Sequence, residues 1–497
     1  MKLGEDFFEP EIIGDVYVSR ALKEVWAVNL DLLSVFQQFC ETHNLRFFLG
    51  FGTLLGAVRH QGFVPWDDDV DILMPRRDFE KLKNLSDEIL EPYFLQSERS
   101  EKGFWHGGMM KFRRSNTTCL ERYDYKNRRS NHGIGLEIMA LDPVSALPAE
   151  QRKQAALVGK FQRLLWAASH EADLFRIRKS DNGAVEKNAW DNLQRKAREY
   201  AISDLEEQFL NACRQYEGKD TGKLALYLFY NRGDRYRIFE SQWFTESVPM
   251  DFAGLVLPAP KGFWQCLRKF YGDGFMGYVA YDKRKPHHPA VWDAKVPYTI
   301  WQKRIIDLYD AGGKKVILFG TGSMAEKFLQ QLSGRLTIFS CVDNNANTWG
   351  KTFMGLEIQS PSILEATPEC WHVIIANGYY REIGKQLEGM GIKDYYVYVD
   401  EWRELFKSPG EQKDGIVLAD KIYNVAGVYV KKSVIEKELI MSIKQLRRRC
   451  DYLMVFCRNE DMKSCLQELR SVNRVIQTTL SILELEKEYY CDVIVEL

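Results

Sequence analysis

The chain of 497 residues is too long for a single hydrophobic core, and at roughly 150 residues per domain it predicts about three domains. Its formal net charge of -1 gives the chain no overall basic field, which argues against nucleic acid as its main partner. Its 45% hydrophobic and 28% charged residues are typical of a globular protein. No apolar run approaches the ~20 residues of a membrane-spanning helix, and ten scattered cysteines without a C-x-x-C pair are typical of reduced thiols. We therefore expect a cytoplasmic protein that at most lies peripherally against the inner face of the membrane.

The first 75 residues predict two helices and two strands around a glycine turn. Apolar residues at steps of three and four predict an amphipathic helix over 15–44. The short apolar run 45–52 predicts a buried strand, residues 53–61 predict a short helix capped by Thr53, and residues 67–74 predict a second strand.

Farther along the chain, the composition changes three times. Residues 150–217 are charged and helical in pattern, which predicts a helical insertion. Between residues 301 and 407 strands alternate with helices, and this order predicts a parallel sheet. A polar linker over 408–415 leads into residues 413–497, which predict a small α/β module without a chemical motif.

The clearest chemical pattern is the run DDDVD at 67–71. If it lies in a strand, Asp67, Asp69 and Asp71 point to one side, with ~6.6 Å between alternate residues, and Asp68 points to the other. Neighbouring carboxylates raise one another's pKa unless a cation lies between them. Oxygen ligands at this spacing suit Mg²⁺ or Mn²⁺. A solvated acidic loop and a calcium site are the alternatives.

Two further features favour a phosphate-handling site. Gly52 and Thr53 lie where a strand gives way to a helix, and backbone amides at a helix N-terminus hold phosphate. Glu137 lies within the apolar run GIGLEIMALDPV, where an acid is costly to bury unless it is paired or binds a metal. We therefore expect Glu137 as a third metal ligand beside Asp69 and Asp71.

Basic and aromatic residues near these acids are candidates for contacts with donor phosphates or base. A cation or a ring at such positions is equally well explained as a surface charge or a packed aromatic, and the sequence leaves both interpretations open. The candidates are Arg59, His60, Trp66, Lys111, Arg113 and Arg114.

The segment FLGFGTLLGAVRHQGFVPWDDDVDILMPRRDFEKL resembles the signature of the LicD family. The resemblance continues through MKFRRSNTT, GIGLEIMALDPV and LPAPKGFWQCLRKFYGD to the paired His287 and His288, and it covers roughly residues 22–289. It implies a nucleotidyltransferase fold and the transfer of phosphocholine or polyol phosphate from a CDP-linked donor to a glycan, with release of CMP. By this resemblance Asp69 and Asp71 are metal ligands.

The resemblance also places Gly52 and Thr53 in the donor-binding turn. The family commonly has aspartate in the strand of the third acid, where this chain has Glu137, and the longer side chain weakens that assignment.

The expected fold is therefore a multidomain combination of α/β and α+β units. A LicD-like nucleotidyltransferase-fold catalytic domain with a mixed sheet spans residues 1–295, including the helical insertion at about 150–217. A Rossmann-like domain with a parallel sheet spans 301–407, and the small α/β module spans 413–497.

The Rossmann-like unit carries a dinucleotide-type fingerprint. Gly320 and Gly322 follow a predicted strand and open a helix, and Asp343 ends the next strand about 20 residues later. The unit is too short for a complete dehydrogenase and resembles small domains appended to bacterial sugar-modifying enzymes. We expect it to bind a sugar nucleotide or a regulatory ligand, or no ligand, rather than to use NAD in redox chemistry.

The leading functional hypothesis is Mg²⁺- or Mn²⁺-dependent transfer from a CDP-linked donor to a cell-surface glycan or a lipid-linked oligosaccharide. One alternative is a nucleotidyltransferase that acts on a sugar phosphate. Another is a nicotinamide-dependent sugar oxidoreductase that uses the motif at 316–343. The acceptor hydroxyl requires a general base, for which Asp67 and Asp71 are both candidates.

Overall fold

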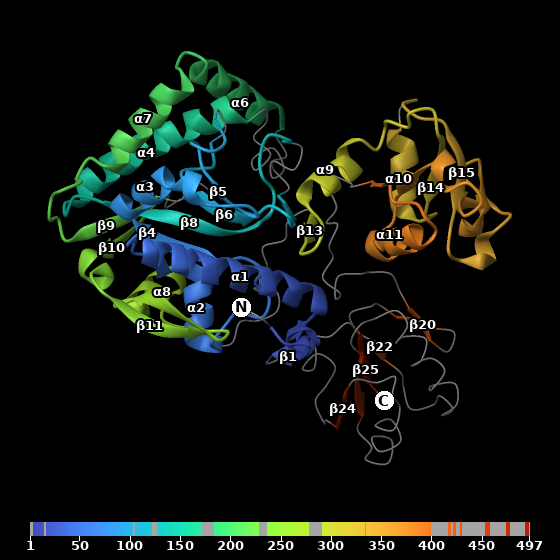
Figure 1. Cartoon of the computed structure of the whole chain (residues 1–497), viewed down its shortest axis with the longest axis horizontal. Coiled ribbons are helices and arrows are strands. Elements are labelled where there is room, and N and C mark those ends of the chain that lie inside the picture. The colour runs from blue at the N-terminus through green and yellow to red at the C-terminus, as the bar shows by residue number, and fades with distance from the viewer. Residues whose placement is uncertain are drawn as a thin grey trace.

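The computed structural model describes residues 3–13, 16–102, 105–121, 127–170, 183–227, 236–277, 291–332 and 334–398, together with six strands beyond residue 415. It has a mixed α/β architecture with several sheets (Figure 1). Among the described helices, none combines the length and the apolar character that crossing a bilayer demands.

A mixed sheet of seven strands forms the centre of the N-terminal part. Its main path runs β10-β9-β8-β4-β3, and β6 pairs with β8 and carries β5 on its other edge. The long strand β8 pairs in parallel with β4 and antiparallel with β6 and β9. The strands are β3 (Phe48–Leu49), β4 (Asp71–Pro75), β5 (Tyr93–Gln96), β6 (Met110–Arg114), β8 (Ile134–Pro143), β9 (Lys223–Tyr227) and β10 (Tyr236–Glu240).

Helices cover both faces of this sheet. Helix α1 (Arg20–Thr42) lies on one face, and α3 (Arg76–Asn84) lies on the other beneath the helices of the insertion (Figure 1). The insertion consists of α4 (Pro148–Ser169), α6 (Gly183–Ala197) and α7 (Ile202–Cys213), which share a core of their own with Trp105. These helices occupy the stretch in which the sequence predicts a helical insertion.

Two predicted boundaries near the acids are wrong. Strand β4 begins at Asp71, so residues 67–70 form a loop rather than the start of a strand. Helix α2 (Phe51–His60) begins earlier than predicted, with Gly50 as its N-cap and no capping side chain. Thr53 therefore does not cap the helix, and its hydroxyl instead accepts a hydrogen bond from the amide of Asp71 at 2.8 Å.

Two hairpins and a further helix complete the N-terminal part. The hairpins are β1 (Glu11–Ile13) with β2 (Val16–Val18), and β11 (Ser247–Phe252) with β12 (Leu255–Pro260). Helix α8 (Phe263–Tyr271) returns to α2, where the rings of Phe51 and Phe270 lie 4.2 Å apart.

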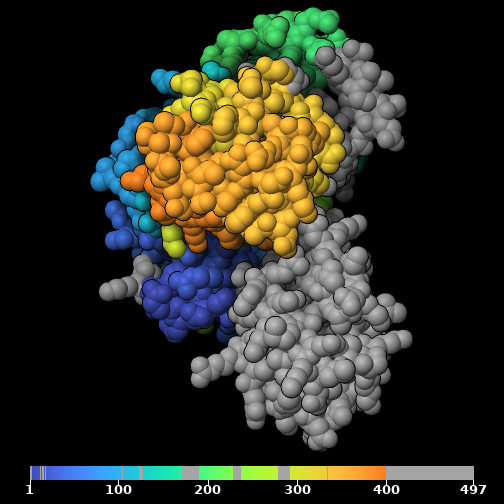
Figure 2. All heavy atoms as spheres, turned by 90° about the vertical axis from the view of Figure 1, so that its right-hand side faces the viewer, coloured from blue at the N-terminus to red at the C-terminus, as the bar shows by residue number. Residues whose placement is uncertain are grey.

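A short ribbon of two antiparallel strands, β7 (Thr118–Leu120) and β13 (Val291–Asp293), leads into the second unit. Helix α9 (Tyr298–Ile306) follows β13, and both lie between the two bodies of the chain (Figure 1). Seen from its own side, the second unit forms a rounded body, with the helical insertion of the first rising beyond it (Figure 2).

The second unit is built on a sheet with the order β16-β17-β15-β14-β18-β19, parallel except for the pair β16-β17. The chain moves outward from the central strand β14 in one direction and then returns to its other side, so the order reverses between β14 and β18. The elements are β14 (Lys315–Phe319), α10 (Ser323–Gln331), β15 (Ile338–Val342), β16 (Thr352–Phe353), β17 (Leu356–Gln359), β18 (Trp371–Ile375), α11 (Tyr380–Gly389) and β19 (Tyr395–Val397).

Beyond residue 415 a hairpin and a four-stranded parallel sheet with the order β22-β25-β23-β24 are described. These strands are β20 (Ile416–Leu418), β21 (Lys421–Tyr423), β22 (Val428–Tyr429), β23 (Leu453–Cys457), β24 (Arg474–Gln477) and β25 (Val493–Glu496).

Candidate active site

The acid loop, residues 67–71, is held in place by two side chains of helix α1. The indole of Trp26 donates to the carbonyl of Asp67 at 2.7 Å, and the amide of Asn29 donates to the carbonyl of Asp68 at 3.0 Å. Both donors come from α1 and are buried. Because these side chains satisfy backbone groups that a strand would pair in a ladder, the loop keeps a fixed shape without regular secondary structure.

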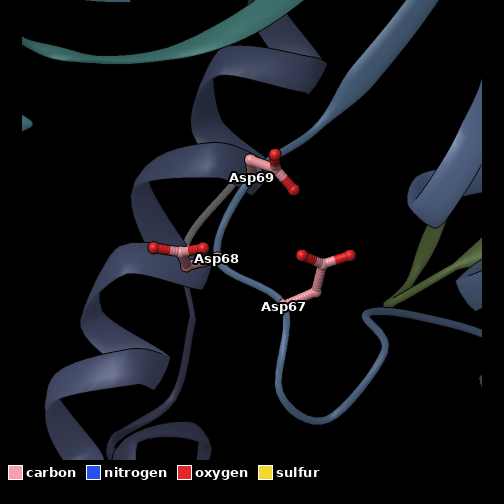
Figure 3. A group of neighbouring side chains, drawn as sticks. All are labelled: Asp67, Asp68 and Asp69. Carbon is pink, nitrogen blue, oxygen red and sulfur yellow. The ribbon is translucent and has the colours of Figure 1, made fainter. Parts of the chain in front are cut away.

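Three carboxylates of the acid loop lie near one another. One oxygen from each of Asp67, Asp68 and Asp69 lies within 4.8 Å of the others. Asp67 and Asp69 point into a common space and Asp68 extends to the opposite side of the loop (Figure 3). Burial and the neighbouring carboxylates of Asp69, Asp68 and Asp71 raise the pKa of Asp67 well above its usual value. A divalent cation among these oxygens would remove that repulsion, and a set of hard oxygen ligands fits Mg²⁺ or Mn²⁺.

Residue 52 must be glycine for this arrangement to form. A methyl group added to Gly52 would overlap a carboxylate oxygen of Asp67. The absent side chain therefore allows the first turn of α2, whose amides lack a capping side chain, to approach the acids closely.

A cavity of about 20 Å³ lies beside the loop. Asp68 and Asp69 contribute to its wall, whereas Asp67 is absent from the lining. The described lining is Val25, Asp68, Asp69, Lys111, Arg113, Cys119, Glu121, Ile134, Gly135, Glu137 and Trp292.

Glu137, the predicted third metal ligand, pairs with a lysine in this structure. Glu137 is in register with Asp71 across β4 and β8, but it lies outside the three-carboxylate group and forms an ion pair with Lys111 at 2.7 Å. Glu121 lies 3.8 Å from the same ammonium group. Although burial opposes its charge, Lys111 has a raised pKa because of these two carboxylates. Among the described residues, the carboxylates that lie close enough together to hold a metal ion are those of Asp67, Asp68 and Asp69, and Asp71 and Glu137 lie outside that group.

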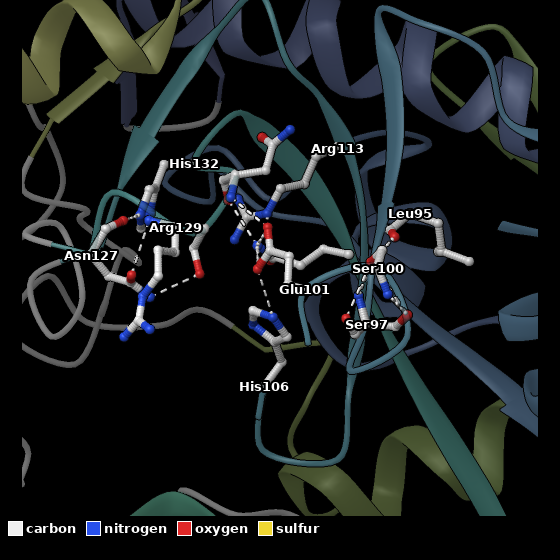
Figure 4. Close-up of polar contacts among 12 residues, drawn as sticks. Leu95, Ser97, Ser100, Glu101, His106, Arg113, Asn127, Arg129 and His132 are labelled. Carbon is white, nitrogen blue, oxygen red and sulfur yellow. Dashed lines mark hydrogen bonds and ion pairs between the residues drawn. The ribbon is translucent and has the colours of Figure 1, made fainter. Parts of the chain in front are cut away.

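Arg113 and Arg114 follow one another on β6 and therefore face opposite ways. Arg113 is buried in the cavity wall and donates to Gln96 at 2.6 Å and to the carbonyl of Gly133 at 2.5 Å. It belongs to a polar network around Glu101 (Figure 4). Arg114 forms an ion pair with Asp31 at 3.0 Å instead and is not part of the cavity lining.

The donor-binding candidates at the end of α2 contact one another outside the cavity lining. Arg59 donates to the ring of His60 at 2.9 Å and to the carbonyl of Phe275 at 3.0 Å, and its guanidinium lies 5.8 Å from the centre of the Trp66 ring. Burial and the charge of Arg59 lower the pKa of His60 to about 4, so His60 is neutral near pH 7. These contacts fasten the loop before the acids to the segment after α8.

Three residues near the acids had not been singled out from the sequence. Glu121 and Trp292 line the cavity. Burial and the carboxylates of Asp71, Asp67 and Asp69 raise the pKa of Tyr271, which shows that this tyrosine at the end of α8 lies close to the acid loop. The resemblance through LPAPKGFWQCLRKFYGD was the available signal for Tyr271, whereas Glu121 and Trp292 carried none.

In the second unit the fingerprint residues lie together at the carboxyl ends of β14 and β15. Gly320 has φ +114°, and a methyl group there would lie 3.1 Å from the carbonyl oxygen of Ala376. Thr321 donates to the carboxylate of Asp343 at 2.7 Å, which ties the glycine turn to that acid. Nothing lies within 4 Å of the position that a side chain on Gly322 would take. The paired His287 and His288 lie outside the described residues.

Comparison with known families gives two matches. Residues 44–133 match the family described as "LicD/FKTN/FKRP, nucleotidyltransferase domain", and this range contains the whole acid loop. Residues 312–398 match the family described as "C2185-like, N-terminal", and this range contains the fingerprint of the second unit.

Individual proteins give a long match and two short ones. The chain is 26% identical over 268 residues to the lipopolysaccharide cholinephosphotransferase LicD of Haemophilus influenzae, an alignment that covers 54% of this chain and 96% of that protein. It is also 50% identical over 46 residues to uncharacterized proteins of Rickettsia prowazekii and Rickettsia typhi, which covers 8% of this chain and 17% and 15% of those proteins. The N-terminal part of the chain therefore carries a LicD family domain, and the acid loop lies inside the residues that match it.

Proposed function

We propose that this protein is a metal-dependent phosphotransferase that moves phosphocholine or a polyol phosphate from a CDP-activated donor to a cell-surface glycan or its lipid-linked precursor, with release of CMP. The observation that carries the proposal is that three aspartate oxygens lie within 4.8 Å of one another beside a cavity. The long alignment with a lipopolysaccharide cholinephosphotransferase supports the choice of a phospho-alcohol donor and a glycan acceptor.

The residues of the acid loop fit a divalent cation. Asp67, Asp68 and Asp69 would hold it, and a bound Mg²⁺ or Mn²⁺ would supply charge neutralisation for the donor phosphates. The amides of the first turn of α2, brought close by Gly52, would orient phosphate oxygens. Lys111 also lines the cavity, and Glu137 and Glu121 stabilise its positive charge.

The transfer also needs a group that accepts the proton of the acceptor hydroxyl. Asp71 stands outside the three-carboxylate group, yet it is close enough to raise the pKa of Asp67. The hydroxyl of Thr53 fixes the backbone of Asp71 at the first residue of β4. We therefore propose Asp71 as the general base, with Asp67 kept in the cation-binding group.

The proposal is tested by incubating the purified full chain with CDP-choline, CDP-ribitol or CDP-glycerol, Mg²⁺ and a glycan acceptor. We expect CMP release together with an increase in acceptor mass equal to the phospho-alcohol. Incorporation of a nucleoside monophosphate into the product would instead support the nucleotidyltransferase alternative. Omission of the divalent cation should abolish the reaction, and turnover unchanged by a chelator would contradict the assigned role of the acid loop.

A further inference from the structure

The two-stranded ribbon formed by β7 and β13 presents one face to each unit of the protein. In antiparallel pairing, directly opposed residues share a face, and Trp292 lies opposite Cys119 while Val291 lies opposite Leu120. Trp292 and Cys119 line the cavity beside the acid loop. Val291 and Leu120 are fully buried in the hydrophobic core of the second unit.

The second unit holds β13 through the first turn of α11. The guanidinium of Arg381 donates a hydrogen bond to the carbonyl of Trp292. The neighbouring Tyr380 is buried, and its ring meets that of Trp301 edge-on at 5.4 Å. Trp301 in turn donates from its indole to the carboxylate of Asp293 at 3.1 Å.

The connection to α9 fastens the other strand of the ribbon. The amide of Tyr298 donates to the carbonyl of Thr117 at 3.0 Å, and the hydroxyl of Thr118 donates to the carbonyl of Val296 at 2.6 Å. Both strands are thus held from the side of the second unit, and these contacts fix the backbone that carries their cavity-facing side chains.

We propose that the second α/β unit is a structural part of the catalytic apparatus, in which Arg381 acts as a positioning residue that holds β13 so that Trp292 forms a wall of the catalytic cavity. This inference rests on the proposed transfer activity. It assigns the unit a function that needs no ligand at Gly320, Gly322 or Asp343. Nearly half of this chain lies outside the alignment with the Haemophilus influenzae protein, so the inference does not follow from that relative.

The test compares Arg381→Ala with Lys385→Ala in the full chain. Lys385 is an exposed cation on the same helix and serves as the matched control. We expect Arg381→Ala to lower kcat about tenfold while KM for the CDP-linked donor changes less than twofold, because misplacement of a cavity wall impairs alignment more than binding. Arg381→Lys, which retains a donor for the carbonyl of Trp292, should recover most of the lost kcat.

A readout that does not depend on turnover accompanies the kinetics. Hydrogen exchange measured by mass spectrometry should show faster exchange at residues 117–121 and 291–293 in Arg381→Ala and unchanged exchange in Lys385→Ala. If kcat and exchange in Arg381→Ala equal those of the control, the inference is wrong. A wild-type chain inactive with every donor would contradict the proposed function instead, and the exchange result would still decide whether Arg381 holds β13.

If Arg381→Ala fails to fold, substitutions at Trp292 decide the question. Trp292→Ala removes the side chain that lines the cavity, whereas Trp292→Phe keeps an aromatic ring there. We expect the alanine variant to lose kcat and the phenylalanine variant to retain most of it. Equal kcat in Trp292→Ala and the wild type would overturn the inference.

Discussion

The carboxylate of Asp69 belongs to the three-carboxylate group, and Asp69 also lines the cavity. We expect Asp69→Asn to lower transfer by at least about 100-fold, since removal of one negative ligand weakens the hold on a cation. The melting temperature should stay the same or rise, because repulsion with Asp67 is relieved. Steady-state kinetics, Mn²⁺ titration and thermal unfolding measure these effects.

Asp251→Asn is the control for this variant, since Asp251 is an exposed acid on β11. It should leave both turnover and Mn²⁺ affinity unchanged. Turnover of Asp69→Asn close to that of the wild type at saturating Mg²⁺ would refute the assignment of Asp69 to the cation site.

Gly52→Ala should lower activity without lowering stability. Alanine favours a helix over glycine by up to about 1 kcal/mol, so the substitution should not by itself destabilise α2. The new methyl group would, however, displace the carboxylate of Asp67. We expect a loss of kcat of at least about tenfold with a melting temperature within a few degrees of the wild type.

The equivalent change at Gly389, which lies in α11 with nothing within 4 Å of the added methyl group, is the matched control. Gly389→Ala should retain full kcat. Full activity in Gly52→Ala as well would show that Asp67 tolerates displacement.

The residues of the site were predictable to different degrees. The run DDDVD could be recognised because several acids in a short segment need a cation. Gly52 could be recognised because the start of a helix can bind phosphate. Glu121 and Trp292 could not, since each reaches the site through contacts with distant parts of the chain, and for Tyr271 the family resemblance was the available signal. For Glu137 the sequence could indicate a costly buried acid but could not show that Lys111 is its partner.

At the scale of elements, the sequence could indicate a strand near residue 71 but not where it begins. The run DDDVDILM alternates well enough to suggest a strand over its whole length. In the structure, Trp26 and Asn29 bind carbonyl groups of residues 67 and 68 and so replace the ladder of a strand. A side chain that reaches across from a helix 40 residues earlier leaves no periodic signal, and this is why the boundary was placed four residues too early.

Helix α7 carries a carboxyl group that should make stability depend on pH. Burial and the charge of Glu98 raise the pKa of Glu206 to about 7 from an ordinary value of 4.5, against the opposing effect of Lys83. A raised carboxyl pKa contributes stability below pH 4.5, and that contribution is lost as the pH rises toward 7. Glu206→Gln should therefore be more stable than the wild type above pH 7 and equal to it below pH 4.5.

Because Glu206 is only half-buried, solvent screening reduces the expected gain to about 1 kcal/mol. Chemical denaturation of both proteins at pH 4 and pH 8 measures it. Glu207→Gln, at an exposed position of the same helix, should show no such pH dependence. A stability difference that is the same at both pH values would contradict the assignment.

The glycine turn of the second unit should respond differently at its two glycines. Gly320→Ala forces a side chain onto a backbone with φ +114° and within 3.1 Å of a carbonyl oxygen, so we expect a loss of about 1 to 3 kcal/mol. Gly322→Val has open space and an extended backbone, so we expect it to fold normally and to retain transfer activity. Thermal unfolding and kinetics of both variants test this contrast, and loss of transfer in a folded Gly322→Val would indicate a ligand requirement at this turn.

At the scale of the whole molecule, alternation of strands and helices predicted the sheet beyond residue 301, and the family resemblance implied the mixed sheet of the N-terminal part. The alternation could not reveal how the sheets are connected. The ribbon joins residues 118–120 to residues 291–293, and neither short strand has a hydrophobic pattern that specifies a partner so far away. Pairing at this separation depends on two folded surfaces that already lie side by side.

The same ribbon has a consequence for how the molecule unfolds. A domain boundary at residue 295 does not separate two independent cores. Leu120 and Val291 precede this boundary in sequence, yet both belong to the hydrophobic core of the second unit. A chain cut after residue 295 would expose both side chains and lose up to about 3 to 6 kcal/mol. Differential scanning calorimetry should therefore show the N-terminal part and the second unit melting in one transition in the full chain, and the shortened chain melting at a lower temperature. We therefore expect the N-terminal part and the second unit to unfold as one cooperative unit.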